Sequence, residues 1–352
     1  MAKTKTFRHG RGRTRRGALL AAVVLLAAGL LSLSIYGVIR LSGGTPESDP
    51  TPGSSVSDSR KTEERTTTVP PTTTTTYPTL SPDAVAQLEG TLTARNVILY
   101  DETHDKILFT RDETARCNPA SLTKLMTAAV AAKYATGEDY TIGSEINLRD
   151  LQASSAYLRS GMKMTLPQLL EAMLLPSGGD AAYSLAVITA RRLSPDEQLS
   201  NMEAAQRFCD LMNQTAAEIG AVDTHFVNPD GMYHTNHATT AADLLKILQF
   251  ACSIPEVREA ISLPSVSYTT VDGTALTYTN TNRLLNSRTA YFYQYATGGK
   301  TGYTDEAGYC LGATAEKGGV KLMAIVMGCA EENARFTESA VLFNAGFALA
   351  GV

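Results

Sequence analysis

The sequence predicts an α/β chain of the α+β type, in which one sheet is covered by helices and a helical insertion lies in the middle of the domain. Two observations lead to this prediction. Residues with the alternation typical of strands occur near both ends of residues 82–352, whereas the residues between them follow a helical period. One sheet is therefore expected to be assembled from distant parts of the chain, with helices packed against it.

The strand-like segments come in two pairs. Asn96–Tyr100 and Lys106–Thr110 flank a short polar turn, which predicts a hairpin. Gly308–Ala315 and Val320–Gly328 predict a second hairpin, joined by a Glu-Lys-Gly-Gly turn. Helical periodicity predicts three helices between the two pairs and one closing helix: Ala120–Ala135, Leu166–Leu175, Ala181–Leu193 and Glu338–Leu349.

Composition and charge exclude several classes of protein. With 43% hydrophobic and 19% charged residues, the 352-residue chain is neither disordered overall, collagen-like nor a multi-span membrane protein. Residues 1–17 carry seven Lys or Arg and no acid, whereas the remainder holds 24 bases and 35 acids. A nucleic-acid-binding domain normally carries its positive charge on the folded part, so no nucleic-acid partner is expected.

The N-terminal region predicts a membrane anchor. Residues 17–39 contain no charged side chain and would span ~34 Å as a helix, enough to cross the hydrocarbon core. The basic residues 1–16 favour a cytoplasmic tail, which would make this a single-pass protein of the cell membrane with an extracytoplasmic domain. The alternative is a cleaved signal peptide, although its apolar stretch is normally shorter.

Residues 40–81 predict a linker, and residues 82–352 a single folded domain. Between residues 42 and 80, 27 of 39 positions are Ser, Thr, Pro or Gly. Such a run buries too little apolar surface to offset the entropy of ordering. No second linker and no internal repeat follows, so the rest of the chain is expected to form one unit.

Ser121 and Lys124 form the first candidate site. Their spacing places both side chains on one face at the start of a helix. A serine hydroxyl is a poor nucleophile unless a base takes its proton, and a lysine can be that base only when its pKa is lowered. The following helix is almost wholly apolar, so Lys124 is expected to be buried. Taken alone, the pair also fits a capping serine beside a solvated lysine.

Two further motifs carry polar side chains between apolar or glycine-rich segments. Ser177 follows Pro176 in a corner between two helices, where it would point into a cleft, and Asp180 is expected to cap the second helix. Lys300 and Thr301 stand on a strand flanked by glycines, which would let a substrate backbone approach closely. Their charge and hydroxyl suit a carboxylate. Each motif alone also fits an ordinary turn.

Together, the three motifs resemble the active-site set of the low-molecular-mass penicillin-binding proteins of the D-alanyl-D-alanine carboxypeptidase family. The likeness runs from about Arg95 to the C-terminus. It includes residues 118–127, 175–182, 224–231, His237 with residues 239–244, 280–285 and 299–304.

The resemblance implies a β-lactamase/DD-peptidase-like fold, in which an antiparallel sheet is flanked by helices and accompanied by a helical subdomain. It also implies a serine-type D-Ala-D-Ala carboxypeptidase. Such an enzyme trims the terminal D-Ala from peptidoglycan stem peptides and is inhibited by β-lactams. By position, it implies that Ser121 is the nucleophile, Lys124 the base and Ser177 a proton relay to the leaving amine. The backbone N–H groups of Ser121 and of the strand near Tyr303 would form the oxyanion hole. No cofactor and no metal is implied.

The resemblance also implies substrate contacts and reveals one departure. Lys300, Thr301 and Gly302 would contact the substrate, and Arg335 would help to hold its terminal carboxylate. The second motif of the family usually ends in Asn, whereas this chain has Gly179. We therefore expect a slower enzyme, and expect Gly179→Asn to raise its rate several-fold.

Three alternative functions stay open at this point. A β-lactamase or a peptidoglycan endopeptidase of the same fold would use the same motifs, and a catalytically weak β-lactam- or peptidoglycan-binding module would retain them without turnover.

Two other groups of residues also have more than one interpretation. His225, His234 and His237 have spacings that fit structural hydrogen bonding better than a zinc site. Cys310 and Cys329 lie on paired strands and would form either a disulfide or buried thiols.

Overall fold

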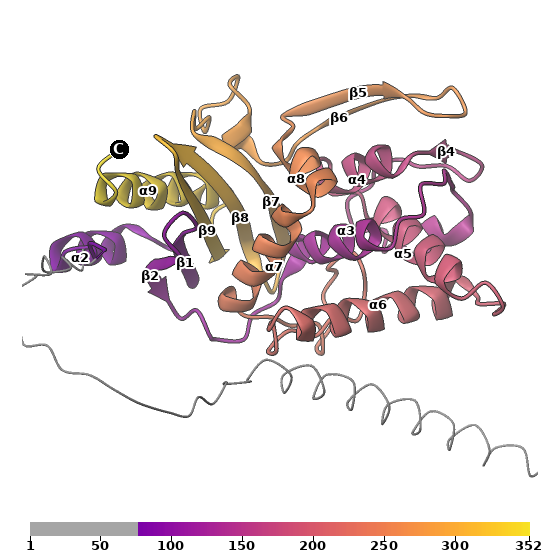
Figure 1. Cartoon of the computed structure of the whole chain (residues 1–352), viewed down its shortest axis with the longest axis horizontal. Helices are drawn as coiled ribbons and strands as arrows, with labels where there is room; N and C mark the ends of the chain where they lie inside the picture. The colour runs from indigo at the N-terminus through magenta and orange to yellow at the C-terminus, as the bar shows by residue number, and fades with distance from the viewer. Residues whose placement is uncertain (1–76) are drawn as a thin grey trace, which may run out of the picture. The chain divides into compact units, whose positions relative to one another are not determined.

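A five-stranded antiparallel sheet is the frame of residues 77–352, the part of the chain that this computed structural model describes (Figure 1). The strands run in the order β2-β1-β9-β8-β7, so the two predicted hairpins join through β1 and β9. They are β1 (Asn96–Asp101), β2 (Lys106–Arg111), β7 (Ala296–Thr304), β8 (Gly308–Lys317) and β9 (Val320–Cys329). The prediction of one antiparallel sheet assembled from distant segments is confirmed, and β7 forms one edge of it.

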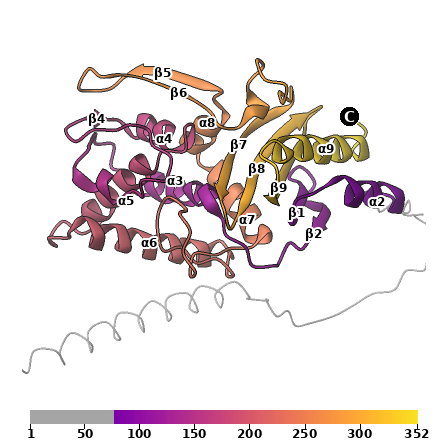
Figure 2. The same cartoon turned by 180° about the vertical axis from the view of Figure 1, so that it is seen from behind.

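Helices cover both faces of the sheet, as the two opposite views show (Figures 1 and 2). α2 (Pro82–Thr91) and α9 (Ala334–Leu349) lie on one side, and α7 (Ala241–Ser253) and α8 (Pro255–Ser262) on the other. Successive strand residues point to opposite faces, so the core is divided in two. On β1, Leu99 packs in the cluster under α9, whereas Ile98 packs in the cluster that continues into the helical subdomain.

The helical subdomain is built around α3 (Thr123–Lys133). This helix is buried from its first residue to Ala131, because other helices surround it. They are α4 (Leu166–Leu174), α5 (Gly179–Leu193) and α6 (Asn201–Glu218), together with α7 and α8. Capping boxes at Thr165 and Ser200 fix the starts of α4 and α6.

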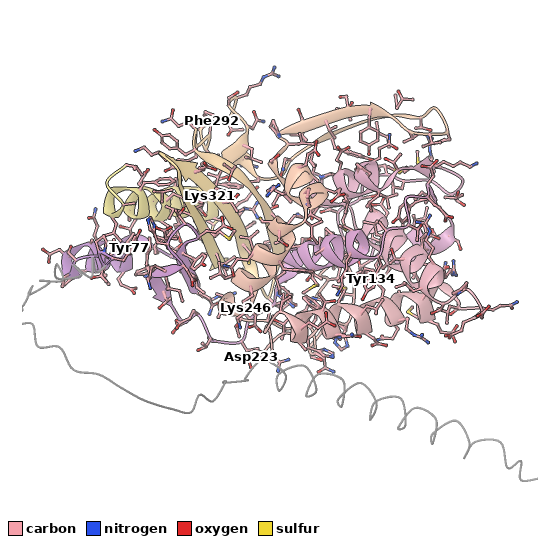
Figure 3. All side chains as sticks on the ribbon, viewed as in Figure 1. Tyr77, Tyr134, Asp223, Lys246, Phe292 and Lys321 are labelled. Atoms are coloured by element: carbon pink, nitrogen blue, oxygen red, sulfur yellow. The ribbon has the colours of Figure 1, made fainter. Side chains whose placement is uncertain are left out.

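Short elements connect the larger ones. Two-stranded sheets are formed by β3 (Tyr140–Thr141) with β4 (Lys163–Met164), and by β5 (Ser265–Thr269) with β6 (Ala275–Thr279). The 3₁₀ turns are η1 (Ala120–Leu122), η2 (Ser144–Leu148) and η3 (Arg283–Leu285). Figure 3 labels Tyr134 at the end of α3 in the helical subdomain, and Lys321 on β9 and Phe292 before β7 in the part built on the sheet.

The predicted basic tail, anchor and most of the linker lie outside the described residues. Within residues 77–352, no helix combines the length and the apolar character needed to cross a membrane. At residue 77 the chain already contacts the sheet: the Tyr77 hydroxyl donates a hydrogen bond to the buried carboxylate of Asp101, and its ring packs on His104.

Candidate active site

A cavity of about 220 Å³ opens beside the edge strand β7, where the sheet meets the helical subdomain. Six of the seven predicted site residues line it: Ser121, Lys124, Ser177, Thr301, Gly302 and Arg335. The seventh, Lys300, lies directly behind Ser177. Residues from four separate segments of the sequence thus meet at one cavity.

Ser121 lies in the 3₁₀ turn η1, immediately before α3. The helix predicted for Ala120–Ala135 therefore starts as a tighter turn, and its α-helical part ends at Lys133. Ala120 has a φ of 47°, an unusual value for a residue with a side chain, and its N–H is held by the Asn118 carboxamide at 3.0 Å. Gly302 packs against this turn, since a Cβ there would lie 3.1 Å from the backbone nitrogen of Ser121.

Lys124 is 1% exposed and points at the predicted nucleophile. Its Nζ lies 2.9 Å from Ser121 Oγ and donates to the carbonyl oxygen of Asp230 at 2.5 Å. Burial lowers the pKa of Lys124 to about 8, and the charges of Asp230 and Asp180 act in the opposite direction. A neutral amine in contact with a serine hydroxyl is an arrangement suited to general base catalysis.

The turn at residues 228–232 holds Lys124 in place, and it was not predicted as part of the site. Gly231 has a φ of 87°, and a Cβ there would lie 1.9 Å from the carbonyl oxygen of Ala120. The Asn228 carboxamide closes the turn by accepting from the Gly231 N–H at 2.8 Å. Because Gly231 packs directly on Ala120, the residue before Ser121, the turn holds the carbonyl oxygen of Asp230 in contact with Lys124 Nζ.

Ser177 and Lys300 form a second serine–lysine contact. Lys300 is fully buried, and its Nζ donates to Ser177 Oγ and to the carbonyl oxygen of Thr301, both at 2.9 Å. Ser177 has a φ of 66°, in the left-handed region that residues with side chains seldom occupy outside functional sites. Burial lowers the pKa of Lys300 well below its usual range, with the nearby charges of Lys124 and Arg335 adding to the effect.

Asp180 has a different role from the expected helix cap. The N-cap of α5 is Gly178, and the Asp180 carboxylate instead accepts from Ser155 Oγ at 2.7 Å and from the N–H groups of Ala156 and Leu158 at 2.8 and 3.0 Å. It thereby ties the loop beside the cavity to α5.

The remaining substrate-side residues lie along β7. Arg335 is 7% exposed, and its Nη1 donates to the carbonyl oxygen of Gly302 at 3.1 Å. The Thr301 hydroxyl lies 2.6 Å from that of Thr281, a cavity-lining residue that was not singled out from the sequence. An arginine and two hydroxyls therefore lie close to the edge of a strand, where an extended peptide can add as a further strand.

The histidines and cysteines singled out from the sequence do not line the catalytic cavity. The buried His237 ring lies 2.9 Å from Thr123 Oγ1 through Nε2 and accepts from the Val227 N–H through Nδ1, so both nitrogens have structural partners. Cys310 and Cys329 are free thiols. Among residues 77–352, no three His, Cys, Asp or Glu side chains gather as a metal ion requires.

Comparison with known proteins shows the family of this chain. The family model of D-alanyl-D-alanine carboxypeptidase matches residues 82–331. The chain belongs to this family. The fold prediction and the prediction of a serine-type peptidase family are thus confirmed.

The relatives of the D-alanyl-D-alanine carboxypeptidase family are similar over most of the described residues. A D-alanyl-D-alanine carboxypeptidase of Streptomyces sp. strain K15 is 32% identical over 69% of this chain and 83% of its own length. DacF of Bacillus subtilis is 29% identical over 74% of this chain, which spans 66% of that relative's length. The crystal structure of the Streptomyces K15 DD-transpeptidase matches with a TM-score of 0.66 and 30% identity, over 73% of this chain and 98% of the other.

Proposed function

We propose that this chain is a serine D-Ala-D-Ala carboxypeptidase that removes the terminal D-Ala from peptidoglycan stem peptides through an acyl-enzyme on Ser121. The observation that carries the proposal is the contact between the buried amine of Lys124 and the hydroxyl of Ser121, in the lining of a cavity bordered by an edge strand. The same serine is the expected target of β-lactams.

The proposed reaction begins with proton transfer. Neutral Lys124 takes the proton of Ser121 while Oγ attacks the carbonyl carbon of the penultimate D-Ala. The backbone N–H groups of Ser121 and Tyr303 stabilise the oxyanion. The peptide C–N bond then breaks, and the proton that Lys124 took passes through Ser177 to the leaving D-Ala amine, which returns Lys124 to its neutral form. Water hydrolyses the ester, which releases the shortened peptide and regenerates Ser121.

The substrate contacts in this proposal follow β7. The stem peptide lies beside Lys300, Thr301 and Gly302 as an additional strand, and its terminal carboxylate faces the hydroxyl of Thr301 and the guanidinium of Arg335. Lys300 holds Ser177 in position through the hydrogen bond from its Nζ to Ser177 Oγ.

The test is D-Ala release from a diacyl-Lys-D-Ala-D-Ala peptide. We expect release by the wild type and none by Ser121→Ala, with Ser144→Ala, in η2 and outside the cavity lining, as a matched serine control. Adding an amine acceptor to the same assay separates hydrolysis from transfer, the activity named for the Streptomyces K15 DD-transpeptidase. Acylation by penicillin without release of D-Ala would instead support a binding module, and rapid penicillin turnover would support a β-lactamase.

An endopeptidase is distinguished by its substrate. Cleavage of cross-linked muropeptide dimers, without release of D-Ala from a pentapeptide, would support that alternative.

We also propose that the chain is held in the cell membrane by residues 17–39, with residues 82–352 outside the cytoplasm. The support is the uncharged segment after seven bases. The full-length protein should fractionate with membranes and keep its N-terminus. A cellular protein that begins near residue 37 would show that the segment is cleaved instead.

A further inference from the structure

The space beside Gly179 is occupied by side chains from elsewhere in the chain. A Cβ at this position would lie 2.9 Å from Cγ and 3.1 Å from Cδ of Arg149, and 3.0 Å from Oδ2 of Asp230. Van der Waals contacts between carbon atoms are normally about 3.5–4.0 Å. Any side chain at position 179 therefore has to displace the stem of Arg149 or the carboxyl of Asp230.

Arg149 uses its guanidinium to hold one wall of the cleft. Its Nη1 donates to the carbonyl oxygen of Ala153 at 2.6 Å and to that of Asp150 at 2.8 Å. Ala153 lines the catalytic cavity together with Gln152 and Ser154. We call residues 152–154 the cleft wall.

Gly179 holds the next residue of the same wall. Its N–H donates to the carbonyl oxygen of Ser154 at 2.8 Å. Two consecutive carbonyl groups of the cleft wall are thus fixed, one by Arg149 and one by Gly179, while Asp180 fixes the residues that follow. Arg149 and Gly179 therefore act on one structure, although 30 positions separate them in the sequence.

We propose that Arg149 is a positioning residue of the active site: its stem takes the place of a side chain at position 179, and its guanidinium fixes the cleft wall opposite β7. This inference rests on the proposed function, because it takes residues 152–154 to be a contact surface for the substrate that acylates Ser121. Glycine at position 179 then leaves the space that the Arg149 stem needs, and it is not a loss of a catalytic group. It follows that Gly179→Asn alone lowers activity, the opposite of the expectation from the sequence.

The test is a double-mutant cycle on the rate of Ser121 acylation by a penicillin, using Arg149→Ala, Gly179→Asn and the double variant. Each single change is expected to slow acylation about tenfold, because each displaces the cleft wall. The double variant is expected to be no slower than the slower single variant, since removal of the arginine stem makes room for the new carboxamide beside Asp230. Losses that multiply to about a hundredfold would overturn the proposal.

Two further variants distinguish positioning from general destabilisation. Arg149→Lys keeps a donor for the wall carbonyls and should be faster than Arg149→Ala, while Arg207→Ala, at an exposed arginine paired with Glu197, should match the wild type. The pH dependence of acylation should stay unchanged in Arg149→Ala, because the contacts of Lys124 stay intact. If Arg149→Ala does not fold, Arg149→Met keeps the stem without the donor: it should slow acylation, and adding Gly179→Asn to it should slow acylation further, because the stem still lies beside position 179. A double variant no slower than Arg149→Met would then overturn the proposal.

A readout that does not depend on chemistry completes the test. Hydrogen exchange of peptides covering residues 150–158 should be faster in Arg149→Ala and in Gly179→Asn than in the wild type, and exchange at the wild-type rate in both would refute the inference. Release of D-Ala is measured separately. A wild type that is acylated but releases no D-Ala would refute the carboxypeptidase proposal, while the coupling between Arg149 and Gly179 would still be measured by acylation.

Discussion

The Nζ atom of Lys124 lies 2.9 Å from Ser121 Oγ and is held from another direction by the Asp230 carbonyl oxygen at 2.5 Å. Lys124 therefore cannot move away from the nucleophile without losing a buried hydrogen bond. The bond comes from a backbone carbonyl, while the nearby carboxylates of Asp230 and Asp180 oppose the lowering of the Lys124 pKa that burial causes.

Lys124→Ala is predicted to slow acylation of Ser121 by ~10²–10⁴-fold, the usual contribution of a general base. Lys133→Ala, at a surface lysine paired with Glu218, is the control and should behave as the wild type. Stopped-flow acylation by a chromogenic β-lactam measures both. Acylation by Lys124→Ala at the wild-type rate would show that another group takes the proton.

The same lysine predicts the pH dependence of acylation. The reactive form is the neutral amine, and its pKa is about 8, so the rate should rise about tenfold per pH unit below that value and level off above it. A rate that is constant between about pH 6 and pH 9 would exclude Lys124 as the titrating base.

Arg335→Ala is predicted to weaken recognition of the substrate carboxylate. A charged hydrogen bond contributes ~1.5–3 kcal/mol, so kcat/KM for a peptide ending in free D-Ala should fall roughly 10–150-fold. The corresponding peptide amide, which has no carboxylate, should be affected much less. Equal losses for the acid and the amide would show that Arg335 supports β7 through Gly302 without contacting substrate.

Gly231→Ala is predicted to destabilise the protein and inactivate it. A Cβ at this position would lie 1.9 Å from the carbonyl oxygen of Ala120, in addition to the cost of ~1–3 kcal/mol for a left-handed residue with a side chain. Gly220 is the matched control, because it has a φ of 78° and a Cβ there would meet no atom within 4 Å. In urea unfolding, Gly231→Ala should lose markedly more stability than Gly220→Ala, and equal losses would contradict the account of the turn.

His237 predicts how stability changes with pH. Burial lowers its pKa to about 3, against ~6.5 in an unfolded chain, so between these values the unfolded state binds more protons. The contribution of His237 to the free energy of unfolding is therefore present above about pH 6.5 and falls by up to ~1.4 kcal/mol per unit as the pH drops. His237→Gln should show a shallower loss in urea titrations from about pH 7 to pH 4, and a loss as steep as that of the wild type would contradict this role of His237.

The sequence predicted the parts of the site that depend on short, fixed spacings. Ser121 and Lys124 lie three positions apart, and Lys300 and Thr301 are neighbours on a strand, so local geometry brings each pair together. The pairing of Ser177 with Lys300 depends on tertiary structure, and its residues were found through the family motifs.

Other residues of the site could not be recognised from their residue type. Asp230 holds Lys124 through a backbone carbonyl, a group that every residue carries. Arg149 reaches Gly179 only because the loop after η2 folds over the start of α5. In the fold, β5 and β6 were missed because each strand has only two inward-facing side chains, too few for the alternation to be distinct. These side chains are Val266 and Tyr268 on β5, and Leu276 and Tyr278 on β6.

The central claim, that Ser121 forms the acyl-enzyme, is tested most directly by intact-protein mass after incubation with a penicillin, followed by peptide mapping. The account predicts one added penicillin mass on the wild type, carried by the peptide that contains Ser121, and no added mass on folded Ser121→Ala. An adduct that persists on Ser121→Ala, or that maps to another peptide in the wild type, would contradict it.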